Sequence, residues 1–215
     1  MFDAVLRRRL DGPLARLAGH IDRPWLTPDR LTVAGLVTGL ASGALAASQL
    51  WGWALVAWLF SRAMDGLDGP LARRRAPSRH GSAAGGFLDI TADFAVYGVT
   101  VIGVAVGTTT GADALSQWLP FAAVLLAYYV NGAAFLAFSS IAERTGRRID
   151  DGRTLNFLGG VAEGAETIVV HSLWLIFPGH AALIAGLWAV VVAVSAVHRI
   201  VAGYLTLRRP DDEKS

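Results

Sequence analysis

Six apolar stretches, five of them long enough to cross the hydrocarbon core of a bilayer, constrain this chain more than any other feature. They occupy residues 31–50, 51–64, 86–107, 118–142, 157–177 and 181–205. With 53% hydrophobic residues and a mean hydropathy of +0.46, the chain is too apolar for an ordinary soluble domain. We therefore predict an all-α polytopic membrane protein with six transmembrane helices. The second stretch is short, and we expect its helix to continue through Asp65 and Ala72.

Apart from Arg62 and Arg199, which lie inside apolar stretches, lysine and arginine lie in alternate connections between these stretches and at the two ends of the chain. They gather in the N-terminal arm, between the second and third stretches, between the fourth and fifth, and in the tail, whereas 48–52, 108–117 and 178–180 contain none. Basic residues are retained on the cytoplasmic side, so we expect both termini in the cytoplasm and a bacterial inner-membrane location. Ala44 to Ala46 imitate a signal-peptide cleavage site, but the long preceding arm and the five following stretches argue against cleavage.

The N-terminal arm, residues 1–26, mixes apolar side chains with arginines. This pattern suits an amphipathic helix in the inner membrane interface, although a merely solvated basic arm explains it equally well. Thr27, Pro28 and Asp29 then form a typical helix start, with an N-cap, a proline at the first helical position and an acidic first turn.

A face of small residues follows in the first transmembrane helix, where glycine recurs every four residues at Gly35, Gly39 and Gly43. Such a face lets a neighbouring helix pack closely. We expect one membrane domain over residues 27–207, between the arm at 1–26 and a cytoplasmic tail at 208–215.

Four carboxylates at helical spacing are the clearest chemical signal. Asp65 and Asp68 are three apart at the inner end of the second helix, and Asp89 and Asp93 are four apart near the inner start of the third. Each pair shares one helix face, and the opposite directions of the two helices place the pairs at nearly the same level. Four anions so close within a membrane require positive charge between them. With no cysteine in the chain, oxygen ligands favour Mg²⁺, Mn²⁺ or Ca²⁺ over zinc, and two such ions would neutralise the four carboxylates.

Other interpretations of the aspartates remain open. Asp65 and Asp68 each precede a glycine, and Asp-Gly commonly marks a turn. Asp89 and Asp93 would also suit buried ion pairs with arginines such as Arg62 or Arg73, or a proton relay.

The four aspartates and their neighbours resemble the signature of a known protein family. The run from Asp65 through Asp68, Gly69 and Ala72 to Arg73, followed by Gly85, Asp89 and Asp93, is similar to the signature D-x2-D-G-x2-A-R, spacer, G-x3-D-x3-D of the CDP-alcohol phosphatidyltransferases. Six spans with cytoplasmic termini, and the entry to the first helix at 27–32, also look like this family. The spacer between Arg73 and Gly85 is longer than is usual, which puts nucleotide contacts from this loop in doubt.

The resemblance implies roles for these positions. Asp65, Asp68 and Asp89 would hold Mg²⁺ or Mn²⁺, and Asp93 would be both a metal ligand and the general base. The CDP moiety would lie against five residues, Asp68, Gly69, Ala72, Arg73 and Gly85. Physical chemistry agrees, since small residues let a nucleotide approach the helix and arginine suits a diphosphate. The resemblance also implies a homodimer, and the stretch 159–167 looks most like poorly characterised bacterial inner-membrane members.

The acceptor side of the expected site is less distinct. Glu163 and Glu166 lie three apart near the start of the fifth helix, where a capping or packing role competes with binding of a polyol or amine. Arg199 lies inside the sixth apolar stretch and would suit an acceptor phosphate, whereas positive-inside topology alone explains the loop arginines.

From these features we predict metal-dependent transfer of a phosphatidyl group from CDP-diacylglycerol to a small polar alcohol, releasing CMP on the cytoplasmic side. One alternative is transfer of a phospho-headgroup from a soluble CDP-alcohol to a lipid acceptor. A cation- or proton-coupled carrier is the alternative outside enzymes, but the outer halves of the spans lack the polar residues that a transport path needs. We expect no nucleic-acid partner.

Overall fold

The computed structural model describes residues 2–75, 83–109, 114–146 and 164–208, and all regular structure in these ranges is helical. The elements are α1 (Phe2–Ile21), α2 (Pro28–Ala47), α3 (Trp51–Arg75), α4 (Ala83–Thr108), α5 (Ala114–Arg144), α6 (Gly164–Ile176), the short 3-10 helix η1 (Pro178–His180) and α7 (Ala181–Arg208). The prediction of an all-α protein is therefore confirmed for this part of the chain.

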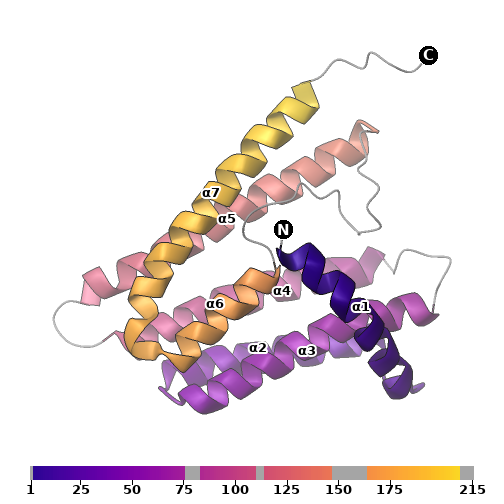
Figure 1. The fold of residues 1–215 in the computed structure, drawn as a ribbon, viewed down its shortest axis with the longest axis horizontal. Coiled ribbons are helices and arrows are strands. Elements are labelled where there is room, and N and C mark those ends of the chain that lie inside the picture. Colours follow the sequence, from indigo (N-terminus) through magenta and orange to yellow (C-terminus); the bar gives the residue numbers. More distant parts are fainter. Residues whose placement is uncertain (1, 76–82, 110–113, 147–163, 209–215) are drawn as a thin grey trace.

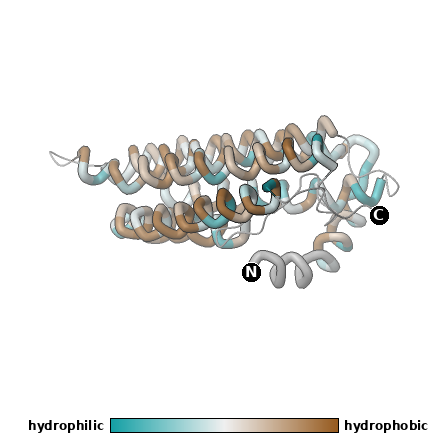
Figure 2. The backbone as a smooth tube through the Cα atoms, turned by 90° about the horizontal axis from the view of Figure 1, so that it is seen from above, coloured by the Kyte–Doolittle hydropathy of each residue, from teal (hydrophilic) through white to brown (hydrophobic). Residues whose placement is uncertain are grey.

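Two groups of helices make up the bundle. α2 packs along both α3 and α4, while α5 and α7 run side by side, and α6 contacts α3 and α7 between the two groups (Figure 1). Figure 2 shows the long helices in two layers. The C-terminal ends of α3, α5 and α7 point to the same end of the bundle, and α1 lies across that end.

Within the described ranges, four helices are long and apolar enough to cross a membrane, namely α2, α4, α5 and the segment Pro178–Arg208. α3 is also long, but its second half carries aspartates and arginines, and α6 has only 13 residues in the described range. Large apolar side chains lie exposed along the bundle, among them Val37, Leu126 and Leu187. A surface of this kind suits contact with lipid. The expected count of six spans goes beyond these four and stays a prediction.

The start of α2 follows the predicted pattern. Thr27 is the N-cap, its hydroxyl accepts a hydrogen bond from the Arg30 amide at 3.2 Å, and Pro28 occupies the first helical turn. The glycine face is confirmed as a packing surface as well, because a Cβ added at Gly39 or Gly43 would collide with valines of α4. α4 can therefore lie unusually close to α2.

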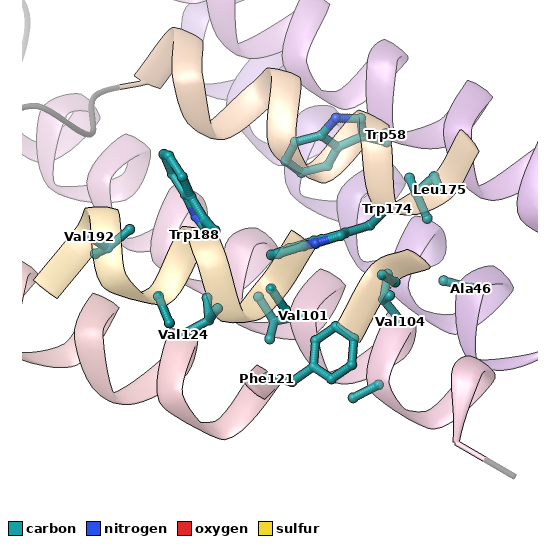
Figure 3. Close-up of a cluster of buried hydrophobic side chains, with 14 of the residues drawn as sticks. Ala46, Trp58, Val101, Val104, Phe121, Val124, Trp174, Leu175, Trp188 and Val192 are labelled. Carbon is teal, nitrogen blue, oxygen red and sulfur yellow. The ribbon is translucent and has the colours of Figure 1, made fainter. Parts of the chain in front are cut away.

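A core of apolar side chains fills the space where α3 to α7 meet (Figure 3). Trp58 of α3 and Trp174 of α6 are fully buried there, with Phe121 of α5 against Trp174 at 6.1 Å between ring centroids. Aromatic rings bury large areas, so this core joins the two groups of helices.

α1 packs on the end of α3 through a small apolar cluster. Ala18 of α1 is fully buried against Leu67 and Leu71 of α3. Asp22 follows α1 and receives hydrogen bonds from Arg75 at 2.7 and 2.8 Å and from Arg74 at 3.2 Å. These bonds, led by the one from Arg75, lower the pKa of Asp22. The arm is thus helical and attached to the bundle, and its place in the membrane interface stays a prediction.

Candidate active site

The acidic segment of α3 is helical throughout. Asp65, Gly66, Asp68 and Gly69 all lie within α3, which continues past Pro70 to Arg75. The Asp-Gly turn interpretation is therefore wrong. Asp68 is 8% exposed, so its carboxylate is largely withdrawn from the surface.

The acidic face of α4 meets that of α3. The carboxyl group of Asp65 is close enough to those of Asp89 and Asp93 for their charges to interact. α3 and α4 both pack on α2, and this common neighbour sets their relative position. The structure thus brings together the predicted aspartates from the two helices.

Arg62 supplies positive charge to this cluster from one turn above Asp65 on α3. Its Nη1 atom lies 2.6 Å from Oδ1 of Asp93 and 3.7 Å from Oδ2 of Asp65. The ion-pair alternative considered from the sequence is therefore confirmed for Asp93, with Arg62 as the partner. Because one guanidinium carries a single positive charge and faces four carboxylates, the arginine neutralises only part of the cluster.

Thr32 of α2 is a site residue whose role the sequence did not reveal. Its hydroxyl donates a hydrogen bond of 2.6 Å to Oδ2 of Asp68, and both side chains are buried. A hydrogen bond to a charged acceptor is stronger than one between neutral groups. The segment 27–32 was noted in the sequence only as a helix entry, and the contact depends on how α2 packs against α3.

A buried polar and aromatic layer lies beyond Arg62. The guanidinium stacks over Trp58 and Tyr97, at 5.2 and 5.1 Å from their ring centroids. His171 of α6 is fully buried, stacks on Trp58 at 4.8 Å and lies 3.0 Å from the Tyr128 hydroxyl. This layer ties α3 to α4, α5 and α6 directly behind the carboxylates.

The residues predicted to contact CDP lie along α3 and at the start of α4. Arg73 is exposed, and its Nη1 would be 3.3 Å from a Cβ added at Gly69, so the guanidinium lies over that glycine. Ala72 and Gly85 are partly exposed within α3 and α4. The lengthened spacer at 76–82 lies outside the described residues.

The donor atoms of the site fit a hard divalent cation, since four carboxylates on two facing helices offer only oxygen. The side-chain positions do not form a finished cage, because among the residues that the structure describes no three carboxylate or imidazole groups are arranged to hold a metal ion. Thr32 and Arg62 explain part of this result, since they engage Asp68 and Asp93. The oxygen donors therefore fit a divalent cation. To coordinate one, the aspartate side chains would have to rotate from the positions that they have in this structure.

The predicted acceptor residues are placed only in part. Glu163 lies outside the described residues, and Glu166 is half-buried in the first turn of α6. Arg199 is 7% exposed on α7, with its guanidinium over the ring of Phe135 at 5.5 Å from the centroid. The acceptor role of Glu163, Glu166 and Arg199 stays a prediction.

Comparison with known proteins agrees with this site. The family model for CDP-alcohol phosphatidyltransferase matches residues 25–195. The chain is 34% identical over 212 residues to the inner membrane protein YnjF of Escherichia coli K12, covering 97% of this chain and 98% of that protein. It therefore belongs to the CDP-alcohol phosphatidyltransferase family and is a transferase of phospholipid biosynthesis.

Two further comparisons extend the similarity. An archaetidylinositol phosphate synthase of Methanothermobacter thermautotrophicus is 33% identical over 171 residues, which cover 79% of this chain and 72% of that protein. The fold matches Mycobacterium tuberculosis phosphatidylinositol phosphate synthase with CDP-DAG bound, at a TM-score of 0.71 and 20% identity over 92% of this chain and 98% of that one. A second structure of that synthase, in complex with manganese and citrate, also gives 0.71. At this identity the structural match supports the fold alone.

Proposed function

We propose that this protein transfers the phosphatidyl group of CDP-diacylglycerol to a small polar alcohol and releases CMP. The observation that carries the proposal is the meeting of the α3 and α4 aspartates around Asp65, in a chain whose family acts on CDP-alcohols. The bound CDP-DAG of the structurally similar synthase supports this donor. The donor's acyl chains would stay in the bilayer while its nucleotide enters from the cytoplasm.

In the proposed reaction the alcohol oxygen attacks the phosphorus that carries the diacylglycerol. The bond from that phosphorus to the bridging oxygen breaks, and CMP leaves with the electron pair. The proton of the alcohol passes to Asp93, whose Oδ1 accepts the hydrogen bond from Arg62. A general base must lie within hydrogen-bonding reach of the proton that it takes, and the bond to Arg62 fixes the position of Asp93.

Asp65, Asp68, Asp89 and Asp93 would hold one or two Mg²⁺ or Mn²⁺ ions, which supply charge stabilisation for the phosphates and the leaving CMP. The manganese in the similar synthase structure supports a divalent cation of this type. Arg73 would bind the diphosphate, and Gly69, Ala72 and Gly85 would leave room for the nucleotide. On the acceptor side we propose Glu163, Glu166 and Arg199.

The proposal includes a topology. α3 and the helix that ends at Ile176 would also cross the membrane, which brings the four apolar spans to six. Both termini and the aspartates would lie on the cytoplasmic side. The membrane domain would cover 27–207, with α1 in the inner interface, the tail at 208–215 in the cytoplasm and a homodimer as the assembly. The inner-membrane relative supports this location.

The test is CMP release by the purified protein in lipid vesicles. Labelled CDP-diacylglycerol is offered with glycerol 3-phosphate, inositol phosphate, serine or choline, and labelled CDP-choline is offered in parallel with diacylglycerol. We expect CMP from CDP-diacylglycerol with one acceptor, and loss of turnover but retained nucleotide binding in Asp93→Asn. Asp29→Asn, at an exposed position on α2, is the matched control. Release of CMP from CDP-choline alone would replace the proposed donor, and cation flux without CMP release would support a carrier.

A further inference from the structure

Arg62 contacts the carboxylates of the site, although it lies outside the sequence signature of the family. It is 7% exposed and lies over the rings of both Trp58 and Tyr97. Its Nη2 donates to the Ser61 hydroxyl at 3.0 Å, and that hydroxyl donates to the Gly35 carbonyl at 2.7 Å. The guanidinium is therefore held from several sides and has little freedom to move away.

The charge of Arg62 is directed at the aspartates. Nη1 lies 2.6 Å from Oδ1 of Asp93 and 3.7 Å from Oδ2 of Asp65. Within a membrane, a charged side chain is costly unless an opposite charge is near. A fixed arginine thus lowers the cost of gathering carboxylates before any ion is bound.

We infer that Arg62 is the resident counter-cation of this site: it holds Asp93 in place and opposes the binding of divalent cations to the aspartates. The inference rests on the proposed function, because it assumes that the four aspartates hold a divalent cation. Two positive charges a few ångströms apart repel each other. Arg62 therefore weakens cation binding, and in return it keeps the carboxylates in position when no ion is bound. It acts on the reaction as a positioning residue.

The test measures cation binding without turnover. Thermal unfolding of the purified protein in detergent, followed by tryptophan fluorescence, is recorded over a range of Mn²⁺ concentrations to give the concentration of half-maximal stabilisation. Arg62→Gln removes the charge, and Arg62→Lys keeps it while losing the planar stacking. Arg16→Gln, at an exposed position on α1, is the control for net charge.

We expect Arg62→Gln to unfold at lower temperature without Mn²⁺ and to need at least about tenfold less Mn²⁺ for half-maximal stabilisation. Arg62→Lys and Arg16→Gln should stay within about threefold of the original midpoint. A purely structural role for Arg62 would lower the unfolding temperature but leave the midpoint unchanged, and that result would overturn the inference. An equal shift in Arg62→Lys and Arg62→Gln would also overturn it, since the charge would then not be the cause.

If Arg62→Gln folds poorly without Mn²⁺, its cation binding can still be measured. The variant is then purified with Mn²⁺ and titrated with a chelator, and failure to fold even at saturating Mn²⁺ contradicts the inference, because the ion should take over the balancing charge. The outcome for the original protein separates the two proposals. If no divalent cation stabilises it, the proposed metal-dependent function fails; if Mn²⁺ stabilises it with the same midpoint in Arg62→Gln, only the role of Arg62 fails.

Discussion

Replacing Gly103 of α4 with alanine should force α2 and α4 apart. A Cβ at this position would lie 2.1 Å from the carbonyl oxygen of Gly43 and 2.7 Å from its carbonyl carbon. A comfortable carbon to oxygen contact is about 3.3 to 3.6 Å, so the two backbones must separate by roughly 1 Å. Neither atom belongs to a side chain that can rotate away, and the whole helix must shift.

The expected cost follows from two opposing effects. Overpacking of a tight contact costs about 1 to 3 kcal/mol, and the rigid backbone partner favours the upper end. Alanine gains about 1 kcal/mol over glycine within a helix. The net loss is about 2 kcal/mol, which corresponds to a fall in Tm of roughly 4 to 8 °C for a domain of this size.

The assay is thermal unfolding in detergent, with Gly98→Ala as the matched control. Gly98 lies on the same helix, but a Cβ added there meets nothing within 4 Å. We expect Gly98→Ala to be neutral or slightly stabilising. Turnover should fall as well in Gly103→Ala, by up to about a hundredfold, because α4 carries Asp89 and Asp93 and a misplacement of about 1 Å suffices for such a loss. Equal Tm and turnover in the two variants would refute the close α2–α4 contact.

Two further predictions concern single polar contacts. Thr32→Val should lower the free energy of unfolding by about 1.5 to 3 kcal/mol because Asp68 loses a buried hydrogen bond, whereas Thr32→Ser should stay close to the original protein in chemical denaturation. Asp22→Asn should loosen the attachment of α1. Because the pKa of Asp22 is lowered, its contribution is complete at pH above 3.8 and is lost as the pH falls through the folded-state value. Protection factors of the α1 amides, which correct for the intrinsic exchange rate, should therefore fall as the pH drops below 3.8 in the original protein and be low already at neutral pH in Asp22→Asn; equal protection in both at neutral pH would contradict this role.

The parts of the fold that depend on local pattern were predictable from the sequence. The apolar stretches locate the central parts of the long helices. The cap at Thr27 was predictable because its hydrogen bond is local: it joins Thr27 to the amide of Arg30, only three residues further along the chain. The spacing of Asp65 and Asp68, and of Asp89 and Asp93, correctly placed each pair on one helix face. Their convergence followed from the opposite directions of α3 and α4.

The contacts between helices were beyond reach of the sequence. Whether Arg62 pairs with Asp93 depends on how far α3 is rotated about its axis, and a pattern of residues on one helix does not set that angle. The bond from Thr32 to Asp68 depends in the same way on how α2 crosses α3. The two Asp-Gly pairs lie within helix and do not form turns. The packing of α3 on α2 stabilises the helix there and overrides the low helix propensity of Gly66 and Gly69.

The central place of α2 decides which changes of length the family fold can tolerate. α3 and α4 pack far more extensively on α2 than on each other, so the loop that joins them does not fix their separation. Residues added between Arg73 and Gly85 should therefore leave the acidic faces in place. One residue inserted in the middle of α2 would instead rotate half of its contact surface by about 100°. Insertions should therefore be common in the loop and almost absent from the helix.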